Sequence, residues 1–367
     1  MAEFQPLKEI YNRAFYKQLA GLLKDAHPSI KPDAFLKDVT RGLNKLELKE
    51  RLRRTTETCR AHLPNDYRKA VDVLKRVAPH IEDDKGGLAG MFVPDFIELY
   101  GCSEAEFDFS MEALAEVTVY SSSEFAVRRF LELDFKRALA YMRKWSGHEN
   151  EHVRRLSSEG ARPRLPWSFQ LRGLVADPKP VRPILEKLRA DPSLYVRTSV
   201  ANHLNDISKD HPEWMLDLMS SWDLKNEHTA WIVKKAARSL IKAGHPRSFA
   251  LFGFEKKPSV RVADFKLKPA AVKIGSDATF ELRLISGKKK SQKLAVDYII
   301  HYVKKDGRQS PKVFKLKELD LEGEIILVKK QSFRDFTTRT HHPGKHRLEI
   351  VVNGNKVAAL GFEVSRK

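Results

Sequence analysis

The chain has 367 residues, of which 42% are hydrophobic, so it is long enough for two or three domains and too apolar for an intrinsically disordered protein. Its 67 Lys and Arg residues outnumber its 48 Asp and Glu residues, and the net charge of +19 favours a polyanionic partner, above all nucleic acid, over a membrane surface. Cys59 and Cys102 are too few for a disulfide framework or a cysteine zinc site, as is typical of a reducing compartment.

The N-terminal segment, MAEFQPLKEIYNRAFYKQLAGLL, mixes acidic and basic side chains in an amphipathic pattern and lacks the uninterrupted apolar core of a signal peptide. No later stretch approaches the roughly 18 apolar residues that a membrane span requires. We therefore expect a cytoplasmic protein that has no membrane partner.

Residues 1–256 are predicted to be helical. Apolar residues recur at spacings of three and four in segments such as YRKAVDVLKRVAPHI and FAVRRFLELDFKRALAYMRKW. Pro, Gly and Asp interrupt this pattern every 12 to 20 residues.

Three helix starts resemble one another: HENEHVRRLSSEGA, DPSLYVRTSVANHL and NEHTAWIVKKAARSL, whose valines at 153, 196 and 233 are 43 and 37 residues apart. These spacings are near the period of HEAT-type helical pairs, so we predict a solenoid of stacked repeats. A basic residue follows each valine, namely Arg154, Arg197 and Lys234. Such residues are either solvated positions near a helix start or a row that contacts phosphates.

Phosphate contacts need only cationic side chains and backbone amides, and they supply affinity without reading the base sequence. The candidate DNA-binding residues are Arg154, Arg155, Arg162, Arg164, Arg197, Lys209, Lys234 and Lys235.

Residues 257–367 are predicted to form a small all-β domain. A period of two appears in VRVADFKLKP, ATFELRLIS, KLAVDYIIHYVKK, GEIILVKKQSF and HRLEIVVNG, with turn signals between them. Six to eight short strands indicate a sandwich of immunoglobulin-like type. From Arg261 onward, 24 Lys and Arg residues face 12 Asp and Glu residues, so this domain is also expected to touch the polyanion.

Three acids stand out against the basic background, and each has a simpler structural interpretation. Glu124 follows three serines, a pattern typical of a helix cap that places an acid in the first turn. Glu159 lies four residues after Arg155 and can pair with it on one helix face. Asp206 lies near a helix end, where local turn chemistry accounts for it equally well.

Trp167 ends the stretch VRRLSSEGARPRLPW, in which Gly and Pro terminate the helix that carries Glu159. It is either an ordinary core residue or an aromatic held at a fixed edge beside the cations. His203 and His211 are interpreted as structural, and neither a metal nor a cofactor is expected.

Four segments resemble the AlkC branch of the AlkC/AlkD DNA alkylation-repair glycosylases: GLAGMFVPDFIELYG, SSSEFAVRRFL, HVRRLSSEGARPRLPW and VRTSVANHLNDISKDHP. The resemblance covers residues 1 to about 255, and the β tail is similar to the immunoglobulin-like domain of some members. It implies a monofunctional DNA glycosylase that releases cationic bases, N3-methyladenine and N3-methylcytosine, without flipping the lesion into a pocket.

The resemblance also implies roles for single residues. Glu124, Glu159 and Asp206 match acids of the family pattern and are expected to stabilise an oxocarbenium-like sugar and to position water. Trp167 is the candidate for packing against the deoxyribose. The implied partner is double-stranded DNA with alkylated bases, bound by a monomer that needs no other protein.

Two alternatives remain at this point. A non-enzymatic HEAT-repeat scaffold or DNA-binding protein explains the basic row and predicts binding without base release. A peptide-binding solenoid explains the fold but not the charge.

Overall fold

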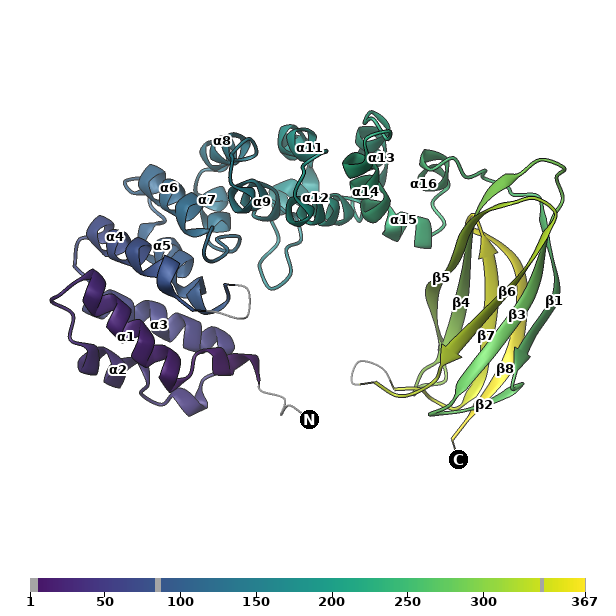
Figure 1. Ribbon diagram of the computed structural model, residues 1–367, viewed down its shortest axis with the longest axis horizontal. Helices are drawn as coiled ribbons and strands as arrows, with labels where there is room; N and C mark the ends of the chain where they lie inside the picture. The colour runs from purple at the N-terminus through teal and green to yellow at the C-terminus, as the bar shows by residue number, and fades with distance from the viewer. Residues whose placement is uncertain (1–5, 83–86, 337–339, 367) are drawn as a thin grey trace. The chain divides into compact units, whose positions relative to one another are not determined.

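The computed structural model describes residues 6–82, 87–336 and 340–366. The chain divides into two compact units, the first made of residues 1–211 and 222–236 and the second of residues 212–221 and 237–367. The first unit is helical, and the second carries all the strands of the described residues (Figure 1).

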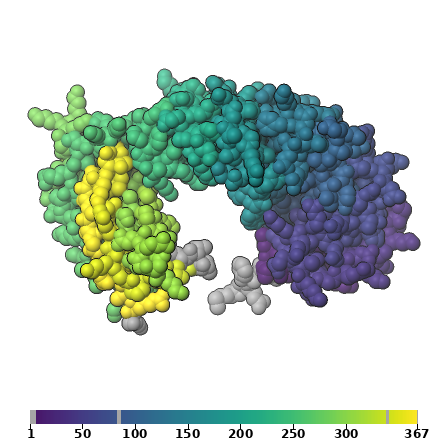
Figure 2. All heavy atoms as spheres, turned by 180° about the vertical axis from the view of Figure 1, so that it is seen from behind, coloured from purple at the N-terminus to yellow at the C-terminus, as the bar shows by residue number. Residues whose placement is uncertain are grey.

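The helices of the first unit are α1 (Arg13–Ala26), α2 (Pro32–Val39), α3 (Leu48–His62), α4 (Tyr67–Val77), α5 (Phe92–Gly101), α6 (Phe107–Val117), α7 (Val127–Leu133), α8 (Phe135–Trp145), α9 (Glu151–Glu159), α10 (Arg172–Ala176), α11 (Arg182–Leu188), α12 (Leu194–Ile207) and α14 (Glu227–Ala236). In one layer α3 packs on α5 and α5 on α7, and farther along α9 packs on α12 and α12 on α14. In the other layer α4 packs on α6, α6 on α8 and α8 on α11. The result is the helical, repeat-like stack that appears as one continuous body from purple to teal in Figure 2.

The three predicted helix starts are confirmed as α9, α12 and α14. Each begins with a polar side chain that accepts hydrogen bonds from backbone N–H groups of the first turn: Asn150, Ser193 and Asn226. The valines at 153, 196 and 233 are all buried. The repeated sequence pattern therefore specifies three helices that enter the stack with the same face inward.

The second unit begins with three helices, α13 (Pro212–Ser220), α15 (Arg238–Lys242) and α16 (Pro246–Leu251). Phe249 of α16 and Phe254 form a small apolar cluster with Ala295 of the β sheet. The amide of Asn353 donates to the carbonyl of Glu255 at 3.0 Å. These contacts join the last helices to the β sheet. The second compact unit therefore begins before the boundary at 256/257 that the sequence predicted between the helical and the β domain.

The strands are β1 (Val260–Lys268), β2 (Ala271–Lys273), β3 (Asp277–Ser286), β4 (Gln292–Val303), β5 (Gln309–Leu321), β6 (Glu324–Ser332), β7 (Gly344–Val352) and β8 (Asn355–Ser365). One sheet has the order β1-β3-β6 and the other β2-β8-β7-β4-β5, antiparallel except for β2 with β8. Inward side chains of both sheets, such as Phe280 and Ile350, share one core. Eight strands in the described part match the predicted six to eight.

Among the described residues, none of the helices has both the length and the apolar character that a bilayer span requires.

Candidate active site

Two arginines join the three predicted acids into one cluster in the helical unit. Arg155 of α9 binds Glu124, in the turn before α7, and lies 3.5 Å from Oε1 of Glu159 at the end of α9. Arg162, three residues beyond Glu159, binds Oε1 of Glu159 at 2.6 Å and Oδ2 of Asp206 on α12 at 2.8 Å. Residues of α9, α12 and the turns before α7 and after α9, up to 82 positions apart, therefore share a chain of alternating charge.

A third arginine, the fully buried Arg128, fixes the backbone that carries Arg162. Arg128 of α7 donates to the carbonyl of Gly160 at 3.0 Å and to that of Arg162 at 2.7 Å. Burial lowers the pKa of Arg128 to about 10, which still leaves it charged at neutral pH. A Cβ atom at position 160 would lie 2.4 Å from Val127, so only glycine allows this approach of α9 to α7.

Glu159 and Asp206 are both buried and held on both carboxylate oxygens. Ser199 of α12 donates to Oε2 of Glu159 at 2.6 Å, while Oε1 faces the two arginines. Asp206 accepts from Arg162 through Oδ2 and from Lys209 through Oδ1, the latter at 3.0 Å. Buried carboxylates with cationic and hydroxyl donors keep their charge at a fixed position.

Glu124 is held through one oxygen only. Its Oε2 accepts from Ser122 at 2.8 Å and from Arg155, whereas no side chain or backbone group of the described residues hydrogen-bonds to its Oε1. The predicted serine cap is wrong: Ser123 donates to the carbonyl of Leu114 at 2.8 Å, and no side chain caps α7. Glu124 therefore has one oxygen available to a ligand or water.

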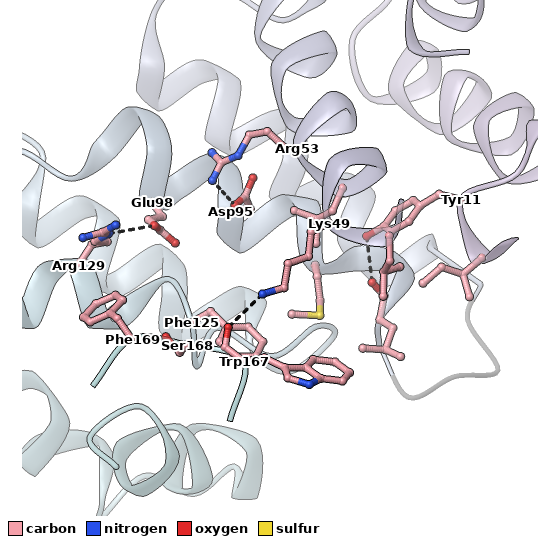
Figure 3. A pocket seen from close by; sticks show the side chains of 15 residues that line it. Tyr11, Lys49, Arg53, Asp95, Glu98, Phe125, Arg129, Trp167, Ser168 and Phe169 are labelled. Atoms are coloured by element: carbon pink, nitrogen blue, oxygen red, sulfur yellow. Dashed lines mark hydrogen bonds and ion pairs between the residues drawn. The ribbon is translucent and has the colours of Figure 1, made fainter. Parts of the chain in front are cut away.

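Trp167 is exposed, so the core interpretation is wrong for it: 67% of its surface is accessible. Its backbone has a left-handed φ of +67°, and its carbonyl accepts from Lys49 at 3.2 Å. The Pro-rich turn after α9 thus presents the indole to solvent at the rim of a pocket of about 420 Å³ (Figure 3).

His203 lies inside α12 near the acids but has no acid–base role. It is fully buried, its Nδ1 lies 3.5 Å from Ser158 Oγ, and burial, reinforced by Arg162, lowers its pKa to about 3. The ring is neutral at physiological pH, in agreement with its interpretation as a structural residue.

Five of the predicted DNA-binding residues form ion pairs with carboxylates. Arg155 and Arg162 are engaged by the acids, and Lys209 also pairs with Asp206. Arg154 forms a two-bond pair with Asp191, and Arg164 forms a similar pair with Asp210.

Aromatic residues that the sequence analysis did not single out accompany several of these cations. Arg155 lies over Tyr195 at 5.0 Å from the ring centre, and Arg197 lies over Trp231 at 5.6 Å. Lys235 also lies over Trp231, at 4.7 Å, and Lys234 next to it is exposed. A cation of one helix start thus stacks on an aromatic of the next start. The two pairs differ in register relative to the valines, so aligning the three starts would not have revealed them.

Family models match both parts of the chain. Residues 115–240 match the model described as "DNA alkylation repair enzyme", and residues 261–366 match "Uncharacterised protein YhaZ, C-terminal Ig-like domain". The first match contains all four predicted catalytic residues, and the second assigns the β sandwich to the predicted immunoglobulin-like type.

Two full-length relatives agree with these matches. The chain is 42% identical to the protein YhaZ of Bacillus subtilis (strain 168) over 98% of its own length and 99% of that protein. It is 43% identical to the alkylpurine DNA glycosylase AlkC of Pseudomonas fluorescens, solved bound to DNA containing an abasic site analogue. That comparison covers 98% of this chain and 100% of the other, with a TM-score of 0.92.

Proposed function

Because the chain belongs to the AlkC family of DNA alkylation repair enzymes, we propose that it is a monofunctional DNA glycosylase for cationic alkylated bases, N3-methyladenine and N3-methylcytosine. The observation that carries the proposal is the arginine-linked cluster of Glu124, Glu159 and Asp206. An abasic site, which the DNA bound by the Pseudomonas relative mimics, is the product that such hydrolysis leaves.

The chemistry requires stabilisation of positive charge on the sugar. A base methylated at a ring nitrogen is cationic and leaves as a neutral group, so no acid has to protonate it. The sugar develops oxocarbenium character as the bond breaks, and fixed carboxylates lower the energy of that state. Glu159 and Asp206 supply such charge from rigid positions, since both oxygens of each are held.

Glu124 is proposed to position the attacking water. Its Oε2 is anchored by Arg155 and Ser122, which leaves Oε1 to accept a hydrogen bond from water and to orient it toward the sugar. The proton that the water loses on attack is taken up by this carboxylate.

Trp167 is proposed to pack against the deoxyribose beside the lesion. Its exposed indole can cover one face of the sugar, and the negative face of the ring favours the developing charge. The lesion then needs no flipping into a tight pocket, because selection depends on the lability of the cationic base and on its attraction to the acids.

Double-stranded DNA is the proposed partner. The net charge of +19 provides attraction to the duplex, and Lys234, the exposed member of the basic row, provides a phosphate contact. The β unit, with its excess of cations, is proposed as a second hold on DNA.

The test is to incubate the protein with methylated DNA and to separate the released bases by chromatography. We expect N3-methyladenine and N3-methylcytosine, and negligible uracil from uracil-containing DNA. Efficient uracil release would contradict the mechanism. Binding to DNA with a steep salt dependence but without base release would favour the non-enzymatic scaffold instead.

A further inference from the structure

The pocket at Trp167 is a second feature of the helical unit, and no role in bond cleavage has been assigned to it. It lies between α3, α5 and the turns that precede α7 and α10. Its volume of about 420 Å³ lies in the range of small-molecule sites.

One side of the pocket is aromatic. Phe125, Trp167 and Phe169 line it together, as Figure 3 shows, and aliphatic side chains such as Leu52 and Met91 extend the apolar surface. Phe169 is fixed by cation–π contacts, with the guanidinium of Arg129 4.8 Å from its ring centre. Flat aromatic walls of this kind suit the faces of a planar ring system.

The other side of the pocket carries two carboxyl groups on α5 (Figure 3). Asp95 is engaged by Thr56 and, at 3.1 Å, by Arg53. Glu98 makes a single ion pair among the described residues, and that pair, with Nε of Arg129, is 3.6 Å long. Glu98 therefore has fewer and longer contacts with other side chains than Asp95.

The protonation of Glu98 gives it two kinds of hydrogen-bonding capacity. Burial and the neighbouring Asp95 raise its pKa to about 7, so near neutral pH a large share of the molecules carries the protonated form. A protonated carboxyl places one donor beside one acceptor. A ring nitrogen next to an exocyclic amino group, as in adenine derivatives, presents the matching pair.

The pocket adjoins the acid cluster through a smaller hollow. That hollow, of about 50 Å³, shares Asp95, Glu98 and Phe125 with the main pocket and is also lined by Ser122. Ser122 donates to Glu124, the proposed water-positioning acid. Ser122 therefore links the hollow beside the main pocket to Glu124.

We infer that this pocket binds a nucleobase, a planar nitrogen heterocycle whose face packs against Phe125 and whose polar edge meets Glu98. The inference rests on the proposed function, since the base that a glycosylase releases is such a ligand. Its role is to hold the departed base away from the sugar, so that water rather than the base meets the oxocarbenium ion.

The test measures the affinity of the full-length protein for free N3-methyladenine by isothermal titration calorimetry. Phe125→Ala removes an aromatic wall, and Glu98→Gln keeps the shape of the polar edge but removes its titration. The matched control is Glu132→Gln, because Glu132 also pairs with Arg129, at 2.7 Å, but does not line the pocket. We expect at least a fivefold weaker affinity in the first two variants and less than a twofold change in the control.

A second arm distinguishes the released base from a base still attached to DNA. The probe is a duplex with 2-aminopurine opposite an abasic site, and it is bound to the wild type and to Phe125→Ala. If 2-aminopurine fluorescence changes on binding to the wild type but not to the variant, the pocket holds a base that is still attached to DNA. No saturable binding of the free base together with no such change would overturn the inference.

Circular dichroism at the assay temperature verifies that each variant is folded. If Phe125→Ala is unfolded, the affinity of Glu98→Gln is compared with that of the wild type instead. Base release from methylated DNA is followed in parallel. If the protein releases the base but shows no binding that depends on the pocket residues, the inference about the pocket is wrong and the proposed glycosylase activity stands. If it shows such binding but no base release, the proposed activity is wrong and the nucleobase site stands.

Discussion

The buried guanidinium of Arg128 donates a hydrogen bond to the backbone carbonyl of Arg162 at 2.7 Å, so one arginine fixes the position of another. Arg162 in turn holds Glu159 and Asp206. The geometry of two of the three acids thus depends on a residue that touches neither of them.

Replacing Arg128 by Met is expected to destabilise the fold and to reduce base release. The substitution leaves the buried carbonyls of Gly160 and Arg162 without their donor, which costs about 2 to 4 kcal/mol of unfolding free energy. Denaturant unfolding measures the loss. Arg182→Met is the control, because Arg182 is exposed and pairs only with Glu186 among the described residues, and its unfolding free energy is expected to stay within about 0.5 kcal/mol of wild type.

The acids are expected to differ in what their removal does. Glu124→Gln should reduce single-turnover base release by about 100- to 1000-fold, since it removes the charge at the water-positioning oxygen. Its loss of stability should be smaller than that of Glu159→Gln, because Arg155 keeps Glu159 as a partner. Glu159→Gln should reduce both activity and stability, because Arg155 and Arg162 lose a buried partner.

Asp210→Asn is the matched control for these variants, since Asp210 pairs with Arg164 at the exposed side of the same region. Wild-type rates in Glu124→Gln would remove this residue from the mechanism, and wild-type rates in both glutamate variants would remove the cluster.

Trp167→Ala is expected to leave the unfolding free energy unchanged within about 0.5 kcal/mol, because the indole is mostly exposed. Base release should fall about tenfold, the equivalent of the roughly 1.4 kcal/mol that an aromatic contact supplies, and Trp167→Phe should recover part of it. Tyr120→Ala, at a tyrosine that is 46% exposed, is the control for loss of a surface aromatic. Equal rates in both alanine variants and wild type would exclude the packing role.

Local sequence patterns predicted those features that depend on neighbours in the chain. The three helix starts share caps and buried valines, and the pair of Arg155 with Glu159 follows from their four-residue spacing. The strands that alternate clearly, such as β3 and β7, were predicted as well. β5 was not predicted, because it is an edge strand whose exposed positions carry many lysines and few apolar residues.

Features that depend on distant contacts could not be predicted in this way. Arg162 reaches Asp206 44 residues away, and Arg128 has the sequence context of a surface helix although it is fully buried. Trp167 looks like a core residue until the left-handed backbone after α9 turns it outward. Glu98 has no distinguishing motif, since its raised pKa comes from its burial in the pocket and from the neighbouring Asp95.

That acidity predicts a pH dependence of stability. Glu98 has a pKa of about 7 in the folded chain, set by burial and Asp95 and opposed by Arg53 and Arg129, against an ordinary value of 4.5. The folded state therefore binds more protons than the unfolded state between these values, so the unfolding free energy falls as the pH rises from about 5 to 7 and then levels off. The contribution of Glu98 to this fall is roughly 2 to 3 kcal/mol.

Glu98→Gln should remove this contribution. Relative to wild type, its unfolding free energy at pH 8 is expected to be higher, because the folded wild type must then carry a poorly solvated charge, whereas at pH 5 the two proteins should be nearly equal. Urea unfolding at both pH values measures the difference, and the comparison cancels the titration of all other groups. Glu132→Gln, at an exposed carboxylate, should show no pH-dependent difference. A Glu98→Gln variant that is less stable than wild type at pH 8 would show that the ionised carboxylate is stabilised by Arg129, and that Glu98 does not offer a protonated carboxyl to a ligand near neutral pH.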